Sequence, residues 1–435
     1  MKQRNLRTDR SPAVNLNLNV RGMRPSATVA INEHSNALIA QGREVFKLGL
    51  GQSPFPVPDA VTKELQVNAF QKDYLPVKGL LVLRQAVADY HRRTQGTPFS
   101  ADDVLIGPGS KELMFLLQLV YYGDLVIPAP AWVSYAPQAR IIGRQVRFMS
   151  TRREDQWKLM PAQLEALCAP DPERPRIVIL NYPSNPTGGT YSSAELKELA
   201  AVARKYRVIL LSDEIYGELH HKGQHVSLAR FYPEGTIVSA GLSKWCGAGG
   251  WRLGTFAFPH TLGWLRDAMA AVASETFTST SAPIQYAAVR AFQGGLDIER
   301  YLVHSRRILK HLGRWCAKTL GEAGVQVAKP EGGFYLFPDF EPLRARLEAR
   351  GIHSGAQLCL QMLDEVGVAM LPGEDFGRPA EELTARLAYV DFDGAKALFA
   401  STQVPLEEPL PDTFLDAQCY NCTEAIRRVA SWLGE

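Results

Sequence analysis

The chain has 435 residues, about three times the usual length of one domain, which favours two or three packed units. Its composition of 46% hydrophobic and 21% charged residues is that of a globular protein, and it excludes a disordered tail, a coiled coil or a collagen-like rod. The 48 Lys and Arg residues nearly balance the 45 Asp and Glu residues, and the formal net charge of +3 argues against a nucleic-acid partner.

The N-terminus and the cysteine content predict a cytoplasmic protein. Residues 1–20 carry positive charge but have no apolar stretch of signal-peptide length, and no later run is long enough to span a membrane. Six cysteines are few for this length, which fits free thiols in a reducing compartment. Cys419 and Cys422 form a single C-x-x-C pair, for which a structural role is favoured over a metal or redox role. We therefore expect no metal site and no membrane partner.

The first 58 residues predict an arm, a helix, a strand and a loop. Residues 1–24 are polar, and we expect them to form an extended arm. Ser26 stands at the N-cap position of a helix that is predicted to run to about Gln41, where Gly42 ends it. Residues 44–50 are strand-like, and three prolines stiffen the loop over residues 51–58.

From about residue 79, short apolar strands alternate with helices. This pattern predicts an α/β fold with a mostly parallel sheet covered on both faces. Ligands of such sheets bind where loops leave the carboxyl ends of the strands. The predicted strands are Val104–Ile106, Asp124–Ile127, Arg176–Leu180, Val208–Leu211, Thr236–Ser239 and Thr255–Phe258, with helices over Ser110–Val120 and Ser193–Lys205 among the elements between them.

After about residue 300 the pattern predicts a smaller α+β unit. A long helix over roughly Ile298–Gly321 precedes short strands at Val325–Ala328, Phe334–Phe337, Val368–Met370 and Arg386–Val390. Residues 391–422 are rich in Pro, Glu and Asp, and we expect a surface excursion before the last helix. We divide the chain into an arm (1–24), the N-terminal part of the small domain (25–58), the large domain (59–300) and the small C-terminal domain (301–435).

Four loops that follow predicted strands carry the candidate chemistry. In the first, Gly109 and Ser110 end a strand where Lys111 opens a helix, so backbone N–H groups and a hydroxyl can hold a phosphate. A Gly-Ser helix start is by itself more often a simple turn. In the second loop, Asn185 precedes Pro186, which predicts a rigid turn that aims the Asn side chain, with a cis peptide bond as one possible geometry.

The third and fourth loops carry charged residues. Asp213 ends an apolar strand, with Tyr216 three residues further on. A carboxylate there needs a cation or strong hydrogen bonds, unless it caps a helix. Lys244 follows another apolar strand, and Arg252 comes eight positions later among glycines. A lysine in a tight, partly desolvated pocket has a lowered pKa and becomes a usable amine nucleophile and base.

Together the four loops describe a site for a phosphorylated aromatic aldehyde. An amine can form a Schiff base with the aldehyde, and a carboxylate can pair with a pyridinium nitrogen. Hydrogen-bond donors can hold a phenolate oxygen, while an arginine and a helix terminus can hold a phosphate. These are the demands of the cofactor pyridoxal 5'-phosphate.

Motifs between residues 23 and 390 resemble those of the class I and II aminotransferases, in particular the aspartate aminotransferase branch. The resemblance implies fold type I of the pyridoxal-phosphate enzymes, a three-layer α/β/α arrangement with a mostly parallel central sheet, plus a smaller α+β domain. The motifs are MRPSATVAIN (23–32), Gly51, Tyr74, VKGLLVLRQAV (77–87), PAWVSY (130–135), NPTGG (185–189), SDEIY (212–216), SK (243–244), GWRLG (250–254), PGEDFG (372–377) and RLAY (386–389).

The resemblance also implies a role in cofactor binding for each matching residue. Lys244 would bind the cofactor as a Schiff base and then shuttle a proton, while Asp213 would keep the pyridine nitrogen protonated. Asn185 and Tyr216 would hydrogen-bond the phenolate oxygen. The other implied contacts are Gly109, Ser110, Ser243 and Arg252 at the phosphate with Lys111 beside them, Trp132 stacked on the ring, and Tyr74 reaching the cofactor of the neighbouring subunit in a homodimer.

The same resemblance implies transfer of an amino group between an L-amino acid and a 2-oxo acid. Arg386 would bind the substrate α-carboxylate, helped by Gly51 and Asn185, with Trp132 in the same site. Thr28 and Lys111 resemble the residues with which one branch of aspartate aminotransferases recognises the distal carboxylate. Aspartate or glutamate is therefore the favoured substrate.

Departures from the family pattern leave other substrates open. Gln52-Ser53 replaces an acidic-Pro pair, and Gly241 has no hydroxyl where some relatives have a serine. An aromatic or alanine-type aminotransferase is the first alternative, and a pyridoxal-phosphate C–S lyase or a catalytically idle binding protein are others. A pocket for aromatic or large apolar amino acids could be made by Phe55, Trp132, Tyr135 and Trp245.

Overall fold

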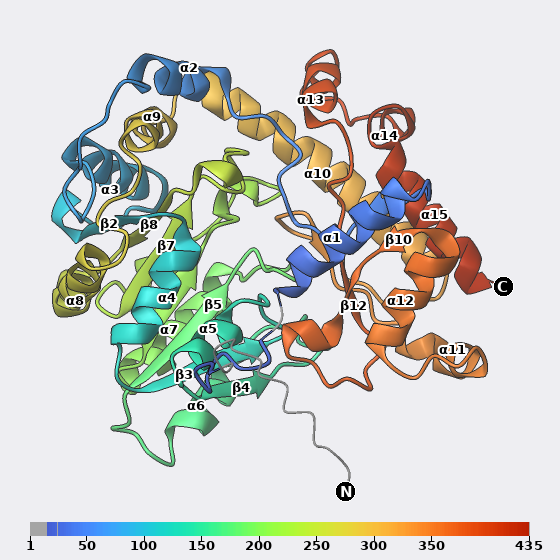
Figure 1. Cartoon of the computed structure of the whole chain (residues 1–435), viewed down its shortest axis with the longest axis horizontal. Helices are drawn as coiled ribbons and strands as arrows, with labels where there is room; N and C mark the ends of the chain where they lie inside the picture. Colours follow the sequence, from blue (N-terminus) through green and yellow to red (C-terminus); the bar gives the residue numbers. More distant parts are fainter. Residues whose placement is uncertain (1–14, 24, 435) are drawn as a thin grey trace, which may run out of the picture.

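The computed structural model describes residues 15–23 and 25–434, and its larger part is built on a seven-stranded sheet (Figure 1). The strand order is β2-β8-β7-β6-β5-β3-β4, and only the two pairings of β8 are antiparallel. The predicted mostly parallel sheet is therefore confirmed. The strands are β2 (Val104–Gly107), β3 (Asp124–Ala129), β4 (Val146–Ser150), β5 (Arg176–Asn181), β6 (Ile209–Asp213), β7 (Thr236–Gly241) and β8 (Gly254–Ala257).

Strand β5 shows why the sequences of these strands are continuous apolar runs. Successive side chains of a strand point to opposite faces. Ile177 and Ile179 pack with Leu113 and Leu265 in one core cluster, whereas Val178 and its neighbour Leu180 pack in another with side chains of α6 and α7. Both faces of the sheet are thus buried under helices, as the three-layer arrangement requires. The covering helices are α4 (Ser110–Val120), α5 (Tyr135–Ile141) and α8 (Gly263–Ser274) for the first cluster, and α6 (Pro161–Cys168) and α7 (Ser193–Lys205) for the second.

A smaller part of the molecule is assembled from both ends of the chain (Figure 1). Strand β1 (Phe46–Lys47) pairs in parallel with β10 (Val368–Ala369). A second, antiparallel sheet has the order β11-β12-β9, with β11 at Leu371–Pro372, β12 at Ala385–Ala388 and β9 at Tyr335–Leu336. The long helix α10 (Leu296–Glu322) runs from the side of α2 into this smaller part. The exact domain boundaries stay a prediction.

The remaining helices complete both parts. Helices α2 (Asp59–Asn68), α3 (Leu81–Gln95) and α9 (Ala282–Gln293) pack together beside β2. Helices α1 (Ala27–Ala40), α11 (Arg344–Ala349) and α12 (Gly355–Val366) belong to the smaller part. Within the described residues, no helix combines the length and the apolar character that a membrane crossing needs.

Three local expectations differ from the structure at the chain's N-terminal end and in the smaller part. The expected arm falls largely on residues 1–14 and 24, outside the described residues, and residues 17–22 form turns in place of an extended segment. Ser26 precedes α1 as expected, but its hydroxyl contacts Thr28 Oγ1 at 3.3 Å and caps no backbone N–H. The strand expected over Val325–Ala328 is wrong, because only Gln326 pairs, in an isolated bridge with Asp339.

The expected surface excursion over residues 391–422 is largely exposed over residues 402–413, but it is helical in part and contributes to the core. The segment forms α13 (Gly394–Thr402) and α14 (Asp412–Gln418), followed by α15 (Tyr420–Gly434). Its acidic and proline residues begin helices, as where the carboxylate of Asp393 accepts hydrogen bonds from the N–H groups of Ala395 and Lys396 at 3.1 Å. Leu410 and Phe414 are buried in the same core cluster as side chains of α10.

The C-x-x-C pair lies at the start of α15 and is packed into this core. Cys419 and Cys422 are fully buried free thiols, and burial raises the pKa of both. No group of three His, Cys, Asp or Glu side chains in residues 15–23 and 25–434 is arranged to hold a metal ion. The structural interpretation of the pair fits these contacts.

Replacing Phe414 by alanine tests whether the C-terminal helices are part of the core. We expect Phe414→Ala to lower the free energy of unfolding by about 3–5 kcal/mol, because a buried ring is removed from a packed cluster. The matched control is Phe399→Ala on α13, where the ring is exposed and the change should stay within about 0.5 kcal/mol. Urea denaturation followed by circular dichroism measures both. Equal losses in the two variants would contradict the assignment.

Candidate active site

A cavity of about 450 Å³ opens where β5, β6 and β7 end. This is the edge of a parallel sheet at which ligands are expected to bind. Most of the residues singled out in the sequence are brought together there. They are Thr28, Gly51, Ser110, Lys111, Trp132, Asn185, Asp213, Tyr216, Ser243, Lys244, Arg252 and Arg386.

Asp213, the last residue of β6, is a buried carboxylate held by neutral donors. The hydroxyl of Tyr135 donates a hydrogen bond to Oδ2 at 2.6 Å, and the hydroxyl of Ser239 donates one to Oδ1 at 3.3 Å. Burial raises the pKa of Asp213 to about 6, although the bond from Tyr135 opposes this rise. No lysine, arginine or histidine in the described residues forms an ion pair with Asp213, so the site has a place for a cationic N–H group.

Lys244 lies in the loop after β7 and is partly buried. Its Nζ donates a hydrogen bond to the carbonyl oxygen of Gly51 at 2.7 Å and lies 5.6 Å from the centre of the Tyr216 ring. Burial lowers the pKa of Lys244 to about 8, helped by the charge of Arg386 and opposed by that of Asp213. This direction agrees with the lowered pKa that the sequence predicts for Lys244.

Arg386 on β12 is fully buried and keeps unused donors. Its guanidinium lies between the rings of Tyr335 and Phe376, with 4.9 Å and 5.0 Å to the ring centres. Nη1 donates a hydrogen bond to Asn185 Oδ1 at 3.2 Å, and Nη2 donates one to the carbonyl oxygen of Gly49. Nε is buried without a hydrogen-bond partner. A guanidinium has five N–H donors, so donors remain for an anion such as a carboxylate.

Arg252 and the start of α4 form a cradle without a carboxylate. Gly109 has a φ of +90°, and a Cβ built on it would come within 2.3 Å of Arg252 Nη2. Arg252 itself has a φ of +55°, a strained conformation for a residue with a side chain. Its Nη1 donates a hydrogen bond to the carbonyl oxygen of Gly249 at 2.8 Å, and no acid of the described chain pairs with it. With Ser110 at the N-terminus of α4, this cradle suits a phosphate.

Three further residues of the predicted substrate site also line the cavity: Thr28, Lys111 and Trp132. Lys111 Nζ lies 5.0 Å from the centre of the Trp132 ring, a cation–π contact. Burial lowers the pKa of Lys111, and the positive charge of Arg252 lowers it further. An anion beside Lys111 would offset both effects and favour the charged form of this lysine.

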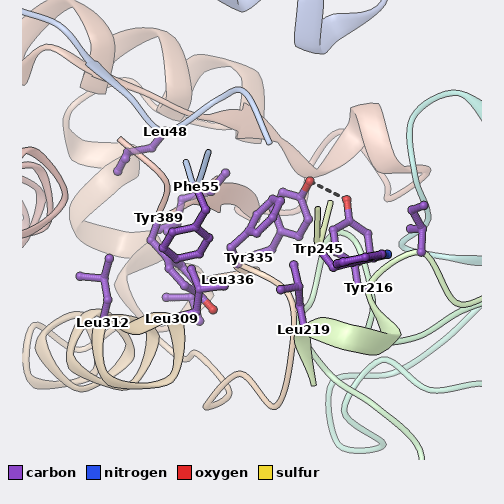
Figure 2. Packing of buried hydrophobic residues seen from close by; sticks show 14 of the residues in the cluster. Leu48, Phe55, Tyr216, Leu219, Trp245, Leu309, Leu312, Tyr335, Leu336 and Tyr389 are labelled. Atoms are coloured by element: carbon purple, nitrogen blue, oxygen red, sulfur yellow. Dashed lines mark hydrogen bonds between the residues drawn. The ribbon is translucent and has the colours of Figure 1, made fainter. Parts of the chain in front are cut away.

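Tyr335 belongs to the cavity although the sequence did not single it out. Its hydroxyl and that of Tyr216 are 2.8 Å apart and share a hydrogen bond (Figure 2). A Cβ on Gly51 would lie 1.9 Å from the Tyr335 hydroxyl, so a side chain at position 51 would force this ring away. In the sequence Tyr335 sits in an aromatic run typical of a core strand. The glycine at position 51 was the one signal that a large group lies opposite it.

The loop that carries Asn185 is closed by a second asparagine. Asn181 Oδ1 accepts a hydrogen bond from the Asn185 N–H at 2.7 Å, and Asn181 Nδ2 donates one to the carbonyl oxygen of Asp213 at 2.9 Å. The cis peptide considered for Asn185–Pro186 is wrong; in this loop the Tyr182–Pro183 bond is cis instead. The hydrogen bond from the Asn185 N–H to the side chain of Asn181 holds the backbone at Asn185. Asn181, Leu50 and Ile215 complete the lining that the sequence missed.

Some predicted residues lie elsewhere. Tyr74 does not line the cavity, and its side chain is 89% exposed. Gly109 lies behind the cavity wall, against Arg252. The aromatic pocket is not assembled, because Phe55 and Trp245 pack in the hydrophobic core (Figure 2) and the Tyr135 hydroxyl is occupied by Asp213. Trp132 alone of the four aromatic candidates lines the cavity among the described residues.

Comparisons with known proteins agree with this geometry. Residues 43–390 match the family model described as aminotransferase class I and II. The chain is 33% identical to an aspartate aminotransferase of Geobacillus stearothermophilus, over 85% of this chain and 93% of that protein. It is 32% identical to an asparagine–oxo-acid transaminase of Streptococcus mutans, over 84% and 92%. The structure of Thermus thermophilus aspartate aminotransferase with maleate superposes with a TM-score of 0.81 at 28% identity, covering 96% of this chain and all of that one.

The pKa of Lys244 can be measured through its reactivity in the cofactor-free protein. The unprotonated amine reacts with acetic anhydride, so labelling of Lys244 should rise through a midpoint near pH 8. Arg386→Gln should move the midpoint up, because a positive charge is removed. Asp213→Asn should move it down, because a negative charge is removed. Mass spectrometry of the labelled peptides measures the rates, with the exposed Lys318 as the reagent standard. Shifts of the same sign in both variants would contradict the electrostatic account.

Proposed function

The chain belongs to the class I and II aminotransferases, and we propose that it moves an amino group between aspartate or glutamate and a 2-oxo acid. The charge of the cavity carries this proposal. Lys111, Lys244, Arg252 and Arg386 line it, while Asp213 is the one acid among its lining residues in the described part of the chain. Arg386 is fully buried and Lys244 partly buried, and cations removed from water are costly unless anions compensate them. A phosphate and the two carboxylates of an acidic amino acid would supply that compensation.

The residues around the cavity fit pyridoxal phosphate, the cofactor that the family implies. When bound, this cofactor supplies an aldehyde that takes up the amino group and a protonated ring that withdraws electrons from the substrate α-carbon. Lys244 Nζ would hold its aldehyde carbon, and the unpaired carboxylate of Asp213 would hold its ring nitrogen. The phenolate oxygen of the cofactor would lie against Asn185 and Tyr216. The cradle of Ser110, Ser243 and Arg252, which the missing side chain of Gly109 leaves open, would hold its phosphate.

Lys244 is suited to move the proton that transamination requires. With a pKa of about 8, part of its amine is unprotonated near neutral pH and can accept the proton of the substrate α-carbon. Tyr216 stays a neutral donor, because burial and the neighbouring Tyr335 raise the pKa of its hydroxyl well above the ordinary value.

Two cations would position the two ends of the substrate. Arg386 has a free Nε–H and further unused donors, which suit a planar carboxylate such as the α-carboxylate. Lys111 lies next to Trp132 with a lowered pKa, where the distal carboxylate of aspartate would restore its preference for the charged form. Thr28, at the start of α1, would contribute a hydroxyl to the same carboxylate.

We also propose that the enzyme is a cytoplasmic homodimer. The family resemblance places Tyr74 at a neighbouring subunit's cofactor, and its 89% exposed side chain is available for such a contact. Exposed apolar side chains of α2 and α3, including Val67, Leu81 and Val82, lie on the same stretch of chain. The six cysteines are all free thiols, which suits a reducing compartment.

Replacing Lys244 tests the catalytic assignment. We expect Lys244→Ala to lose the yellow colour of the loaded enzyme and to lower turnover of aspartate with 2-oxoglutarate by at least about 10³-fold, since both cofactor attachment and the proton carrier are removed. Borohydride reduction of the wild type should fix the cofactor to the peptide that contains Lys244. Lys318→Ala, on the surface of α10, is the control and should keep full activity.

The outcome separates the alternatives. Full activity in Lys244→Ala would overturn the mechanism, and release of pyruvate or ammonia in place of amino-group transfer would indicate a lyase. Mixing Lys244→Ala subunits with Tyr74→Ala subunits tests the dimer. A mixed dimer contains one intact site, so activity should exceed that of either variant alone.

Replacing Lys111 tests substrate choice. Loss of a charge-assisted hydrogen bond should lower kcat/KM for aspartate by about 10- to 100-fold in Lys111→Ala. Leucine and alanine have no distal carboxylate, so the turnover of either amino acid should change little. Steady-state kinetics with each donor and 2-oxoglutarate measures both values. An equal fall for aspartate and leucine would show that Lys111 serves the cofactor or the helix start and does not recognise the substrate.

A further inference from the structure

A second cavity, of about 520 Å³, lies apart from the catalytic one and shares no lining residue with it. Its walls are one face of α10, the turn over residues 221–223 and the segment over residues 406–410. The turn follows η2 (Gly217–Leu219) directly. The segment 406–410 lies beyond residue 390, where the match to the family model ends, so one wall of the cavity is made by residues outside the family match.

Positive side chains dominate this second cavity. Lys222, Arg306, Arg307, Lys310 and Arg314 line it, together with two histidines. The arginines and the lysine of α10 recur at intervals of three and four residues, which places them on one helix face. The acids in the lining are Glu407 and Glu408, and both are exposed.

Two of the arginines hold the walls together. Arg306 forms an ion pair with the carboxylate of Glu218, and its Nε donates a hydrogen bond to the carbonyl oxygen of Glu218 at 2.6 Å. Arg307 donates hydrogen bonds to the carbonyl oxygens of Val404 at 2.9 Å and Pro405 at 2.8 Å. These contacts join α10 to the other two walls and leave little of either guanidinium for a ligand.

The other three cations have no such partners. The side chains of Lys222, Lys310 and Arg314 form no ion pair and no hydrogen bond within residues 15–23 and 25–434, although all three face one cavity. Nε2 of His311 is buried there without a hydrogen-bond partner, 3.7 Å from the carboxylate of Asp412. Like charges gathered in this way repel one another unless an anion lies between them.

His221 in the same cavity makes contacts that suit a positive charge. Its Nδ1 and Nε2 each lie 3.1 Å from a carbonyl oxygen, of Pro330 and Gly333. A carbonyl oxygen only accepts hydrogen bonds, so both contacts are hydrogen bonds only when the ring carries two protons. Burial lowers the pKa of His221 to about 4; the two carbonyl contacts oppose this shift, and the charges of Arg314 and Lys310 add to it. A bound anion would relieve this conflict.

We propose that this cavity binds a phosphate-bearing small molecule. A phosphoryl group carries about two negative charges and presents acceptor oxygens on several sides, which matches unpaired cations that come from different walls. The volume exceeds that of a single phosphate and leaves room for the organic part of a phosphate ester. A bound ligand would link the 221–223 turn and α10 with the segment 406–410 through its own charges.

Calorimetric titration of the cofactor-loaded enzyme tests the proposal independently of the catalytic assignment. Loaded enzyme freed of excess cofactor keeps the catalytic phosphate cradle filled, so pyrophosphate, inorganic phosphate and glucose 6-phosphate can report on the second cavity at constant ionic strength. We expect one saturable site for the phosphate compounds. The double variant Lys310→Ala/Arg314→Ala should weaken it at least about tenfold. Lys318→Ala, one turn beyond Arg314 on α10, outside the cavity lining and paired with Glu322, is the matched control and should bind as the wild type does.

Each outcome decides the proposal. Tighter binding of glucose 6-phosphate than of inorganic phosphate supports an ester, and the reverse order supports free phosphate as the ligand. Equal affinity in the double variant and in Lys318→Ala overturns the site, as does the lack of saturable binding up to roughly 10 mM. Binding of citrate without binding of any phosphate compound overturns the phosphoryl assignment. Arg314→Glu, which changes an exposed side chain alone, repeats the test if the double variant folds poorly.

Discussion

The catalytic cavity depends on charges that the folded chain buries without pairing them to one another. Asp213 and Arg386 are buried and Lys244 is partly buried, and none of the three forms an ion pair with another residue of the described chain. Burial opposes each charge, which raises the pKa of the carboxyl group and lowers that of the amine. The protein bears this cost because neutral donors and carbonyl oxygens hold each group in place. Ligand charges would complete the electrostatics, so anion binding at this one place would need no large net charge on the chain.

The same contacts join the two parts of the molecule. Arg386 comes from the small antiparallel sheet, but it donates a hydrogen bond to Asn185, which follows a strand of the large sheet. Tyr335 of the small sheet meets the Tyr216 hydroxyl from the loop after β6. A ligand that binds between these groups would therefore contact both parts at once. The geometry of the site depends on how the parts pack, and the absence of a side chain at Gly51 lets Tyr335 approach.

How far the sequence predicts this structure depends on whether the signal is local. Buried strands such as β5 show as apolar runs, whereas β4 was missed because it lies at the sheet edge with most of its side chains partly exposed. Asp393 looked like part of a loop, although its carboxylate caps a helix. The lowered pKa of Lys244 followed from its position between a strand and a Gly-rich loop. The role of Tyr335 in the cavity could not be predicted, because the Tyr216 hydroxyl that it contacts lies more than a hundred residues away in the sequence. The contact expected of Tyr74 needs a second subunit.

The two cavities use cations in different ways, and this decides how each would respond to salt. In the catalytic cavity Arg386 is fully buried, so dissolved ions screen its attraction for an anion only weakly, whereas Lys111 and Arg252 are exposed. In the second cavity Lys222 and Arg314 are exposed, and their attraction falls as the Debye length shortens to about 8 Å at physiological ionic strength. A ligand of the second cavity must therefore gain specificity from several contacts made together. Occupancy there would fall with rising ionic strength more steeply than the binding of a carboxylate at the buried Arg386.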